Sequence, residues 1–313
     1  MISKSILLVP CFLVSFLLFP TGNGLSLSKR LGVLTTKKRT QKKETGSTTA
    51  TSACEGLEGC HVLKQLGGGA QGDVFVAEAV IAGTSKKVVI KLDTKSKVDQ
   101  EAESMQAVSN APWGNNLTPV FHEKGVVSGS KDGRLVMELL GEETIGDCVS
   151  QWQTVGHLAG GGGDFTKSQD IDFAVAAKNW VSILRAIKAL KEHKWHHCDT
   201  QPYNLFVNQC ATTAKLIDWE RAHAPVGGKE APCRSSGDVL KLLTSFAFLF
   251  GKNHSNALMF TIQTSSSGRA DGTLFPSDKR VQANVAILGK ARELETADEE
   301  LAFIGQLLEP WEG

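Results

Sequence analysis

Three polar side chains with the chemistry of a phosphate-transfer site lie close together in this chain of 313 residues. Asp199 is followed five residues later by Asn204, and Asp218 comes fourteen residues after that, behind a short apolar segment. In phosphoryl transfer, one carboxylate takes the proton of the acceptor hydroxyl, while an amide and a second carboxylate hold magnesium on the nucleotide phosphates. We therefore expect Asp199 to be catalytic, and Asn204 and Asp218 to be metal ligands.

A glycine-rich stretch upstream has a spacing that lets a turn approach phosphate oxygens with its backbone. Gly67, Gly69 and Gly72 form a G-x-G-x-x-G pattern, and Val74 follows at a position suited to cap an adenine ring. The pattern alone also fits a dinucleotide-binding fold, but that fold requires a helix after the glycines. Residues 73–80 are typical of a strand instead, so we predict a β-hairpin that binds the nucleotide.

Lys91 is embedded in an apolar, β-branched strand at 86–92. A charge in such a strand is costly unless it is paired. Apolar residues recur at helical spacing over 98–108 and place Glu101 on the apolar face, so Glu101 is the expected partner and Glu103 the fallback. The alternative is a surface lysine on an edge strand beside a solvated helix.

The remaining elements would position these groups. Residues 135–141 read as a strand that ends in a turn and contains Glu138. Two short strands, 205–207 and 215–217, would form a hairpin that delivers Asp218. A long helix is expected just before Asp199, with a buried stripe at Trp180, Ile183, Leu184, Ile187 and Leu190.

Taken in order, these signals resemble the protein-kinase superfamily, over residues 61–250. The resemblance implies an α+β, bilobal protein-kinase-like fold, with a small antiparallel-sheet lobe bearing one helix at about 58–140 and a larger helical lobe at about 141–313. It also implies ATP and Mg²⁺ as cofactors. Lys91 would then orient the phosphates, the backbone around Glu138 would bind the adenine edge, and Asp238 would brace the catalytic loop.

The pattern departs from the superfamily in three places. Gln201 stands where protein Ser/Thr kinases usually have a lysine, which removes a positive charge near the transferring phosphate. Trp219 and Glu220 replace the Phe and Gly that usually follow the metal-binding Asp. The segment from Asp218 to Asp238 is short and contains no A-P-E sequence, so a peptide-docking segment is truncated or absent.

These details leave the acceptor open. The sequence of residues 198–204 resembles the divergent protein-kinase-domain family of the secretory pathway. The sequence of residues 217–222 instead resembles the aminoglycoside phosphotransferase and choline kinase families. The leading hypothesis is a phosphotransferase acting on a hydroxyl of a protein. The alternatives are a small-molecule or glycan kinase, and a pseudokinase that serves as a binding module.

The N-terminus predicts export. A basic residue, Lys4, precedes a mostly apolar run at 6–19 and then small residues, which predicts a signal peptide at 1–24. Residues 25–53 are basic, rich in Ser and Thr and read as a disordered linker before a kinase-like domain at 54–313. A secretory or extracellular location is expected, with no stable membrane span after cleavage. A type II signal anchor and a bipartite organelle presequence are the alternatives.

Cysteine and charge refine this picture. Six cysteines follow the signal and allow 15 sets of three disulfides, and the short spacing of Cys54 and Cys60 predicts that these two are paired. Eight of the 34 basic residues lie in 1–43, where there is no acid, so the remainder carries 26 basic and 33 acidic side chains, a balance of −7. Such a surface is not that of a nucleic-acid-binding domain.

Overall fold

The computed structural model describes residues 50–69, 72–140, 144–145, 148–149, 152–154, 172–208, 213–227, 233, 237–251, 260, 263 and 272–312. The predicted signal peptide and residues 25–49 of the predicted linker lie outside this part. The end of that linker is ordered, because residues 50–53 are helical and Ala53 is fully buried. Ala53 packs in a small apolar cluster beside Cys54 and Cys60, which form a disulfide as predicted.

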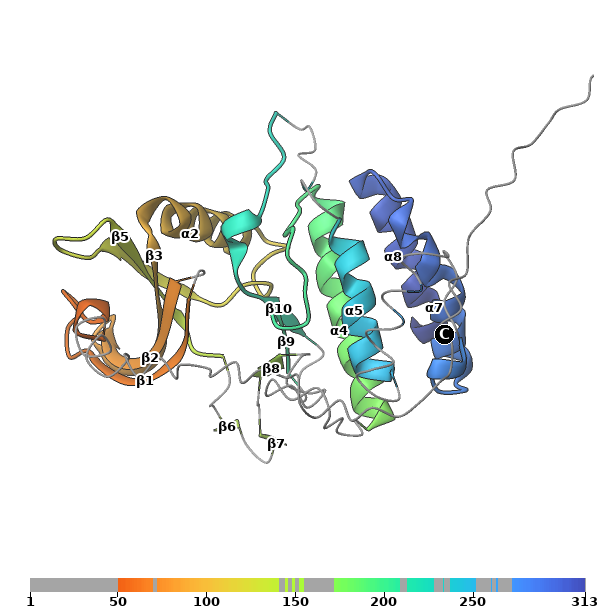
Figure 1. Ribbon diagram of the computed structural model, residues 1–313, viewed down its shortest axis with the longest axis horizontal. Coiled ribbons are helices and arrows are strands. Elements are labelled where there is room, and N and C mark those ends of the chain that lie inside the picture. Colours follow the sequence, from red (N-terminus) through yellow and green to blue (C-terminus); the bar gives the residue numbers. More distant parts are fainter. Residues whose placement is uncertain are drawn as a thin grey trace, which may run out of the picture. The chain divides into compact units, whose positions relative to one another are not determined.

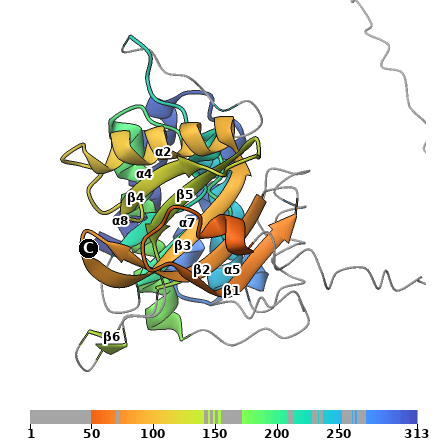
Figure 2. The ribbon, with the colours of Figure 1, turned by 90° about the vertical axis from the view of Figure 1, so that its left-hand side faces the viewer.

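The first lobe is a five-stranded antiparallel sheet in the order β1-β2-β3-β5-β4, with one helix, α2, packed against it (Figures 1 and 2). A short hairpin joins β1 to β2, as the glycine pattern predicts. The elements are β1 (His61–Gly69), β2 (Gly72–Ile81), β3 (Thr84–Thr94), α2 (Lys95–Ser109), β4 (Phe121–Val126) and β5 (Asp132–Glu138).

The alternation of side chains along β3 separates the core of this lobe from the site. Val88 and Ile90 are fully buried in the cluster that contains Ala53. Val89 and Lys91 point to the opposite face, because successive residues of a strand alternate. Lys91 lies opposite Val74 in the β2–β3 register, so both side chains share that face.

The second lobe is mainly helical and is joined to the first by the segment after β5 (Figure 1). A three-stranded sheet, in the order β10-β9-β8, packs against α4, and β6 pairs with β7. The elements are β6 (Thr144–Ile145), β7 (Cys148–Val149), β8 (Trp152–Thr154), α4 (Phe173–Glu192), β9 (Leu205–Asn208), β10 (Ala214–Leu216), η2 (Trp219–Arg221), α5 (Asp238–Phe250), η3 (Gly272–Leu274), α7 (Lys279–Leu288), η4 (Gly289–Arg292) and α8 (Ala297–Glu312).

Helix α4 is the predicted long helix, and its apolar stripe forms the centre of the second lobe. Asp172 caps its N-terminus by accepting hydrogen bonds from the backbone of Ala174 and Val175. The predicted stripe residues are fully buried and pack with α5, α7 and α8. The chain thus adopts the bilobal α+β arrangement that the sequence predicts. None of the described helices has the length and apolar character needed to cross a membrane.

Candidate active site

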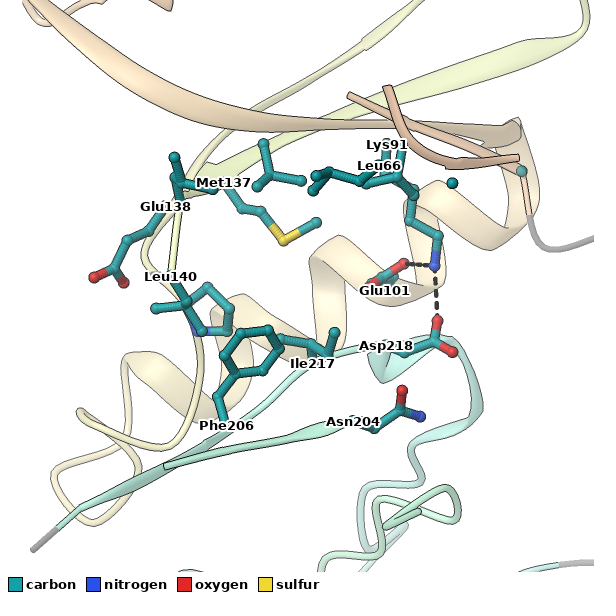
Figure 3. Close-up of a pocket in the computed structure, with 16 residues that line it drawn as sticks. Leu66, Lys91, Glu101, Met137, Glu138, Leu140, Asn204, Phe206, Ile217 and Asp218 are labelled. Atoms are coloured by element: carbon teal, nitrogen blue, oxygen red, sulfur yellow. Dashed lines mark hydrogen bonds and ion pairs between the residues drawn. The ribbon is translucent and has the colours of Figure 1, made fainter. Parts of the chain in front are cut away.

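A cleft of about 590 Å³ lies between the sheet lobe and the β9–β10 hairpin (Figure 3). Its walls contain every predicted binding residue except Gly69. Asp199 is not part of the lining and accepts a hydrogen bond from Asn204, which is. The lining residues are Leu66, Gly67, Gly72, Val74, Val89, Lys91, Glu101, Pro119, Met137, Glu138, Leu139, Leu140, Asn204, Phe206, Ile217 and Asp218. One end of the cleft is therefore apolar, and the other end carries the charged groups.

Lys91 is held between two carboxylates at the charged end. Its Nζ donates to Glu101 Oε2 and to Asp218 Oδ1, each at 2.7 Å (Figure 3). Burial alone would lower the pKa of Lys91, but the two carboxylates outweigh it and hold the pKa above its ordinary value. Burial raises the pKa of Glu101, against the opposing effect of Lys91. The Lys91–Glu101 pair is the one that the sequence predicts.

The glycine hairpin depends on Gly72 for its geometry. Gly72 has φ +86° and pairs with Gly69 at the end of the hairpin. A Cβ atom at Gly72 would lie 2.1 Å from the carbonyl oxygen of Leu92, so no other residue fits without a shift of the backbone. The turn residues 70–71 lie outside the described part, and the approach of this turn to phosphate stays a prediction.

Glu138 lies at the rim of the apolar end. Its carboxylate accepts hydrogen bonds from Lys215 Nζ at 2.6 Å and from the backbone of Val120 at 2.9 Å. The side chain is thus used to join β5 to β10 and to the segment before β4. The sequence assigns adenine binding to the backbone of this segment, and that role stays a prediction.

Asp199 and Asn204 form one hydrogen-bonded unit. Asn204 Nδ2 donates to the backbone oxygen and to Oδ2 of Asp199, both at 3.0 Å. These two bonds assign the amide orientation and turn Oδ1 of Asn204 toward Asp218 (Figure 3). On the other side, Lys241 Nζ lies 3.0 Å from Asp199 Oδ1 and also donates to the backbone oxygen of Cys198.

The residues fit a magnesium ion on nucleotide phosphates. Asn204 and Asp218 present oxygen atoms, which are the ligands that Mg²⁺ prefers. Asp218 also has φ +65°, a left-handed conformation that is costly for a residue other than glycine. Such strain persists where the surrounding structure enforces it, and it is concentrated at functional sites.

The start of α5 braces the loop that carries Asp199. Asp238 is fully buried and accepts from the backbone N–H groups of His197 at 2.9 Å and Cys198 at 2.8 Å. Burial opposes its charge, but Lys191 at 2.8 Å keeps the pKa of Asp238 below its ordinary value. Glu300 of α8 lies 2.6 Å from the same lysine. The predicted brace is present, and α8 adds to it a carboxylate that the sequence does not reveal.

His197 and Trp219 fill the space beneath the loop. The His197 ring is fully buried, lies edge-on to Trp219 with 4.7 Å between ring centroids, and accepts a 3.3 Å hydrogen bond from the backbone of Asp199. Burial lowers the pKa of His197, so the ring is neutral at pH 7. The buried ring and its hydrogen bond to the backbone give His197 a structural role in the loop. Glu220, where a glycine is usual, pairs with Lys97 of α2 at 3.4 Å.

A second disulfide reaches the site. Cys198, immediately before Asp199, is bonded to Cys233, 35 residues further along the chain. No spacing rule in the sequence separates this pairing from the others, so sequence reasoning missed it. The bond links the loop that carries Asp199 to the chain that precedes α5.

Comparisons with known proteins add little beyond this geometry. Protein-family profiles give no match, and no curated protein matches the sequence. Among solved structures, the chain is similar to a crystal structure described as a kinase domain, with 16% identity and a TM-score of 0.43. The match covers 69% of this chain and 64% of that one, which is less than two thirds of its length.

Proposed function

We propose that this chain is an ATP- and magnesium-dependent phosphotransferase that moves the γ-phosphoryl group to a hydroxyl acceptor. The observation that carries the proposal is that Lys91 of β3, Glu101 of α2, Asn204 just before β9 and Asp218 just after β10 line one cleft. The cleft has an apolar end suited to a purine and a charged end suited to phosphates. Its volume of about 590 Å³ lies in the range of sites for small molecules and cofactors.

Each residue has a role in this proposal. Lys91, fixed by Glu101, donates to the nucleotide phosphates. Asn204 and Asp218 hold Mg²⁺, which supplies charge neutralisation on the phosphate oxygens when bound. Asp199 accepts a hydrogen bond from the acceptor hydroxyl and receives its proton. Placement and electrostatic stabilisation account for most of the catalysis in such a site.

The proposed location is the secretory pathway or the extracellular space. Two disulfides lie among the described residues, and such bonds persist in oxidising compartments. One of them adjoins the proposed catalytic residue Asp199, so the active form would need an oxidising environment. The predicted signal peptide agrees with this location.

The identity of the acceptor divides the leading proposal from its alternatives. A protein hydroxyl is the first candidate, and a glycan or small-molecule hydroxyl is the second. The short segment between Asp218 and Asp238 favours the second, because it gives little chain for docking a peptide. A pseudokinase would bind ATP without turnover, and the complete set of Lys91, Asp199, Asn204 and Asp218 argues against it.

A thermal-shift experiment with ATP tests the proposal, with and without Mg²⁺. We expect magnesium-dependent stabilisation of the wild-type protein and none for Asp218→Ala. Transfer from ³²P-labelled ATP to proteins, glycans and amino alcohols would then identify the acceptor class. The absence of any ATP response in the wild-type protein would refute the proposal, and binding without turnover on every acceptor would favour the pseudokinase.

A further inference from the structure

The loop that carries Asp199 contains no cation of its own. Residues 198–208 include neither Lys nor Arg, and His197 is buried and neutral. A phosphoryl group in transfer carries negative charge on its equatorial oxygens, which an enzyme stabilises with positive groups. Lys91 serves the side of the cleft that faces α2, so the acceptor side needs a positive group from elsewhere.

Lys241 is in the position to provide it. It lies one turn along α5 from Asp238, so both side chains project from the same face of the helix toward the loop. Its Nζ lies 3.0 Å from Asp199 Oδ1, and its side chain is 19% exposed. An ammonium has three donors, and the contacts with Asp199 and Cys198 use two of them.

The same contacts show that Lys241 is more than a surface lysine. Cys198 has φ +62°, its backbone N–H is held by Asp238, and its backbone oxygen is held by Lys241. The first turn of α5 therefore fixes both sides of the residue before Asp199. A side chain fixed in this way contacts Asp199 Oδ1 with little conformational entropy left to lose.

We infer that Lys241 supplies from α5 the catalytic positive charge that the loop itself lacks, a role that rests on the proposed phosphotransferase function. During transfer the acceptor oxygen bonds to the γ-phosphorus, the bond from phosphorus to the β–γ bridging oxygen breaks, and ADP leaves. The acceptor proton moves to Asp199. Lys241 holds Asp199 for this proton transfer and donates its remaining N–H to the transferring group.

The Lys241→Gln variant separates charge from hydrogen bonding, because an amide still donates to Cys198 and Asp199. We expect kcat for phosphate release from Mg-ATP to fall by roughly 100-fold, as for loss of one charge-stabilising donor, with the Kd for Mg-ATP unchanged within about twofold. Lys188→Gln on the exposed face of α4 is the matched control and should keep the wild-type rate.

A double variant that places a positive charge within the loop itself gives the decisive test. Gln201 Nε2 lies 3.5 Å from Asp199 Oδ2, so a lysine there reaches the same carboxylate. Gln201→Lys added to Lys241→Gln should recover at least about tenfold in kcat, which a purely structural role of Lys241 would not allow. Lys241→Arg, which keeps the charge, should lose less than Lys241→Gln and serves if the glutamine variant does not fold.

The outcomes separate the two proposals. A wild-type protein without Mg-ATP binding or turnover refutes the phosphotransferase function itself. A wild-type protein with turnover that Lys241→Gln leaves unchanged refutes only the role of Lys241. A loss in Lys241→Gln without rescue by Gln201→Lys refutes the catalytic charge and leaves Lys241 as a structural contact.

Discussion

At the scale of single residues, Lys91 shows how the site is maintained before a nucleotide arrives. One ammonium faces two carboxylates, at 2.7 Å each, and only 8% of its side chain is exposed. Without a cation there, Glu101 and Asp218 would repel each other in a poorly solvated space. Lys91 thus holds the proposed metal ligand Asp218 in place.

Replacing Lys91 tests this coupling. Lys91→Met leaves Glu101 buried without a partner, so we expect unfolding to become easier by about 3 kcal/mol. Adding Glu101→Gln removes the uncompensated charge and should return a large part of that loss, because neighbouring residues are not additive. Urea unfolding of the four proteins of the cycle measures the coupling. If the loss of stability in the double variant equals the sum of the losses in the two single variants, the ion pair is contradicted.

At the scale of elements, the start of α5 holds the loop that carries Asp199 through side chains, and a disulfide lies next to it. Asp238 and Lys241 hold its backbone, while Cys233, just before the helix, is bonded to Cys198. The loop is therefore attached to α5 by polar contacts and by a covalent bond. The disulfide between Cys54 and Cys60, which closes a short loop, packs against the core of the sheet lobe instead.

The two disulfides should differ in their effects. The chain-entropy relation gives about 4 kcal/mol for the 35-residue loop and about 2 kcal/mol for the six-residue loop. We expect Cys198→Ser with Cys233→Ser to lower both stability and turnover. Cys54→Ser with Cys60→Ser is the control and should lower stability alone. Equal turnover in the two double variants would show that the bond at Cys198 does not position Asp199.

Helix α8 contributes to the same loop from the far end of the described chain. Glu300 is buried, lies 2.6 Å from Lys191 and accepts from the backbone of Val239 at 3.3 Å. Its carboxylate also lies so close to Gly237 that a Cβ atom there would be 2.1 Å away. The N-terminus of α5 is thus shaped around this one side chain.

Glu300→Gln should cost about 2 kcal/mol, the value of a hydrogen bond to a charged group, because it leaves Lys191 with one carboxylate. Glu309→Gln on the exposed face of the same helix is the matched control, with no expected change. Thermal unfolding of both variants measures the difference. Equal melting temperatures would show that α8 is not coupled to the loop.

The sequence predicts those features that local patterns encode. The strand with Lys91, the helix with Glu101 and the stripe of α4 follow from periodicity, and the short spacing from Cys54 to Cys60 indicates their disulfide. Lys241 and Glu300 could not be predicted in the same way. Lys241 meets Asp199 across 42 residues, and Glu300 meets Val239 across 61, contacts that only the packing of helices creates.

At the scale of the whole molecule, the buried neutral His197 links the stability of the fold to pH. Burial depresses its pKa below the ordinary value of 6.5, against the opposing pull of Asp238, Asp218 and Asp199. A group with a depressed pKa contributes stability above its unfolded pKa and loses it as the pH falls toward the folded value. As the pH falls, His197 therefore binds a proton in the unfolded chain at a higher pH than in the folded protein.

We therefore expect the free energy of unfolding to fall below about pH 6.5, by at most about 1.4 kcal/mol per pH unit for this one group. His197→Asn should flatten the profile between pH 6.5 and 5. His122, half-buried on β4 and also depressed in pKa by burial, contributes in the same window, so His122→Gln serves as the comparison. A wild-type profile without slope there would contradict the neutral state of His197.

The place of α8 in the chain has a consequence for biosynthesis. A ribosome makes this helix after every other described element, yet Glu300 from it completes the support of the loop with Asp199. A nascent chain that already has all the residues lining the cleft would still lack this carboxylate. The charge balance around Lys191 is reached only when α8 has emerged and docked. Completion of this support would then coincide with translation of α8, and we expect a chain cut before Ala297 to be less stable and to lose the proposed activity.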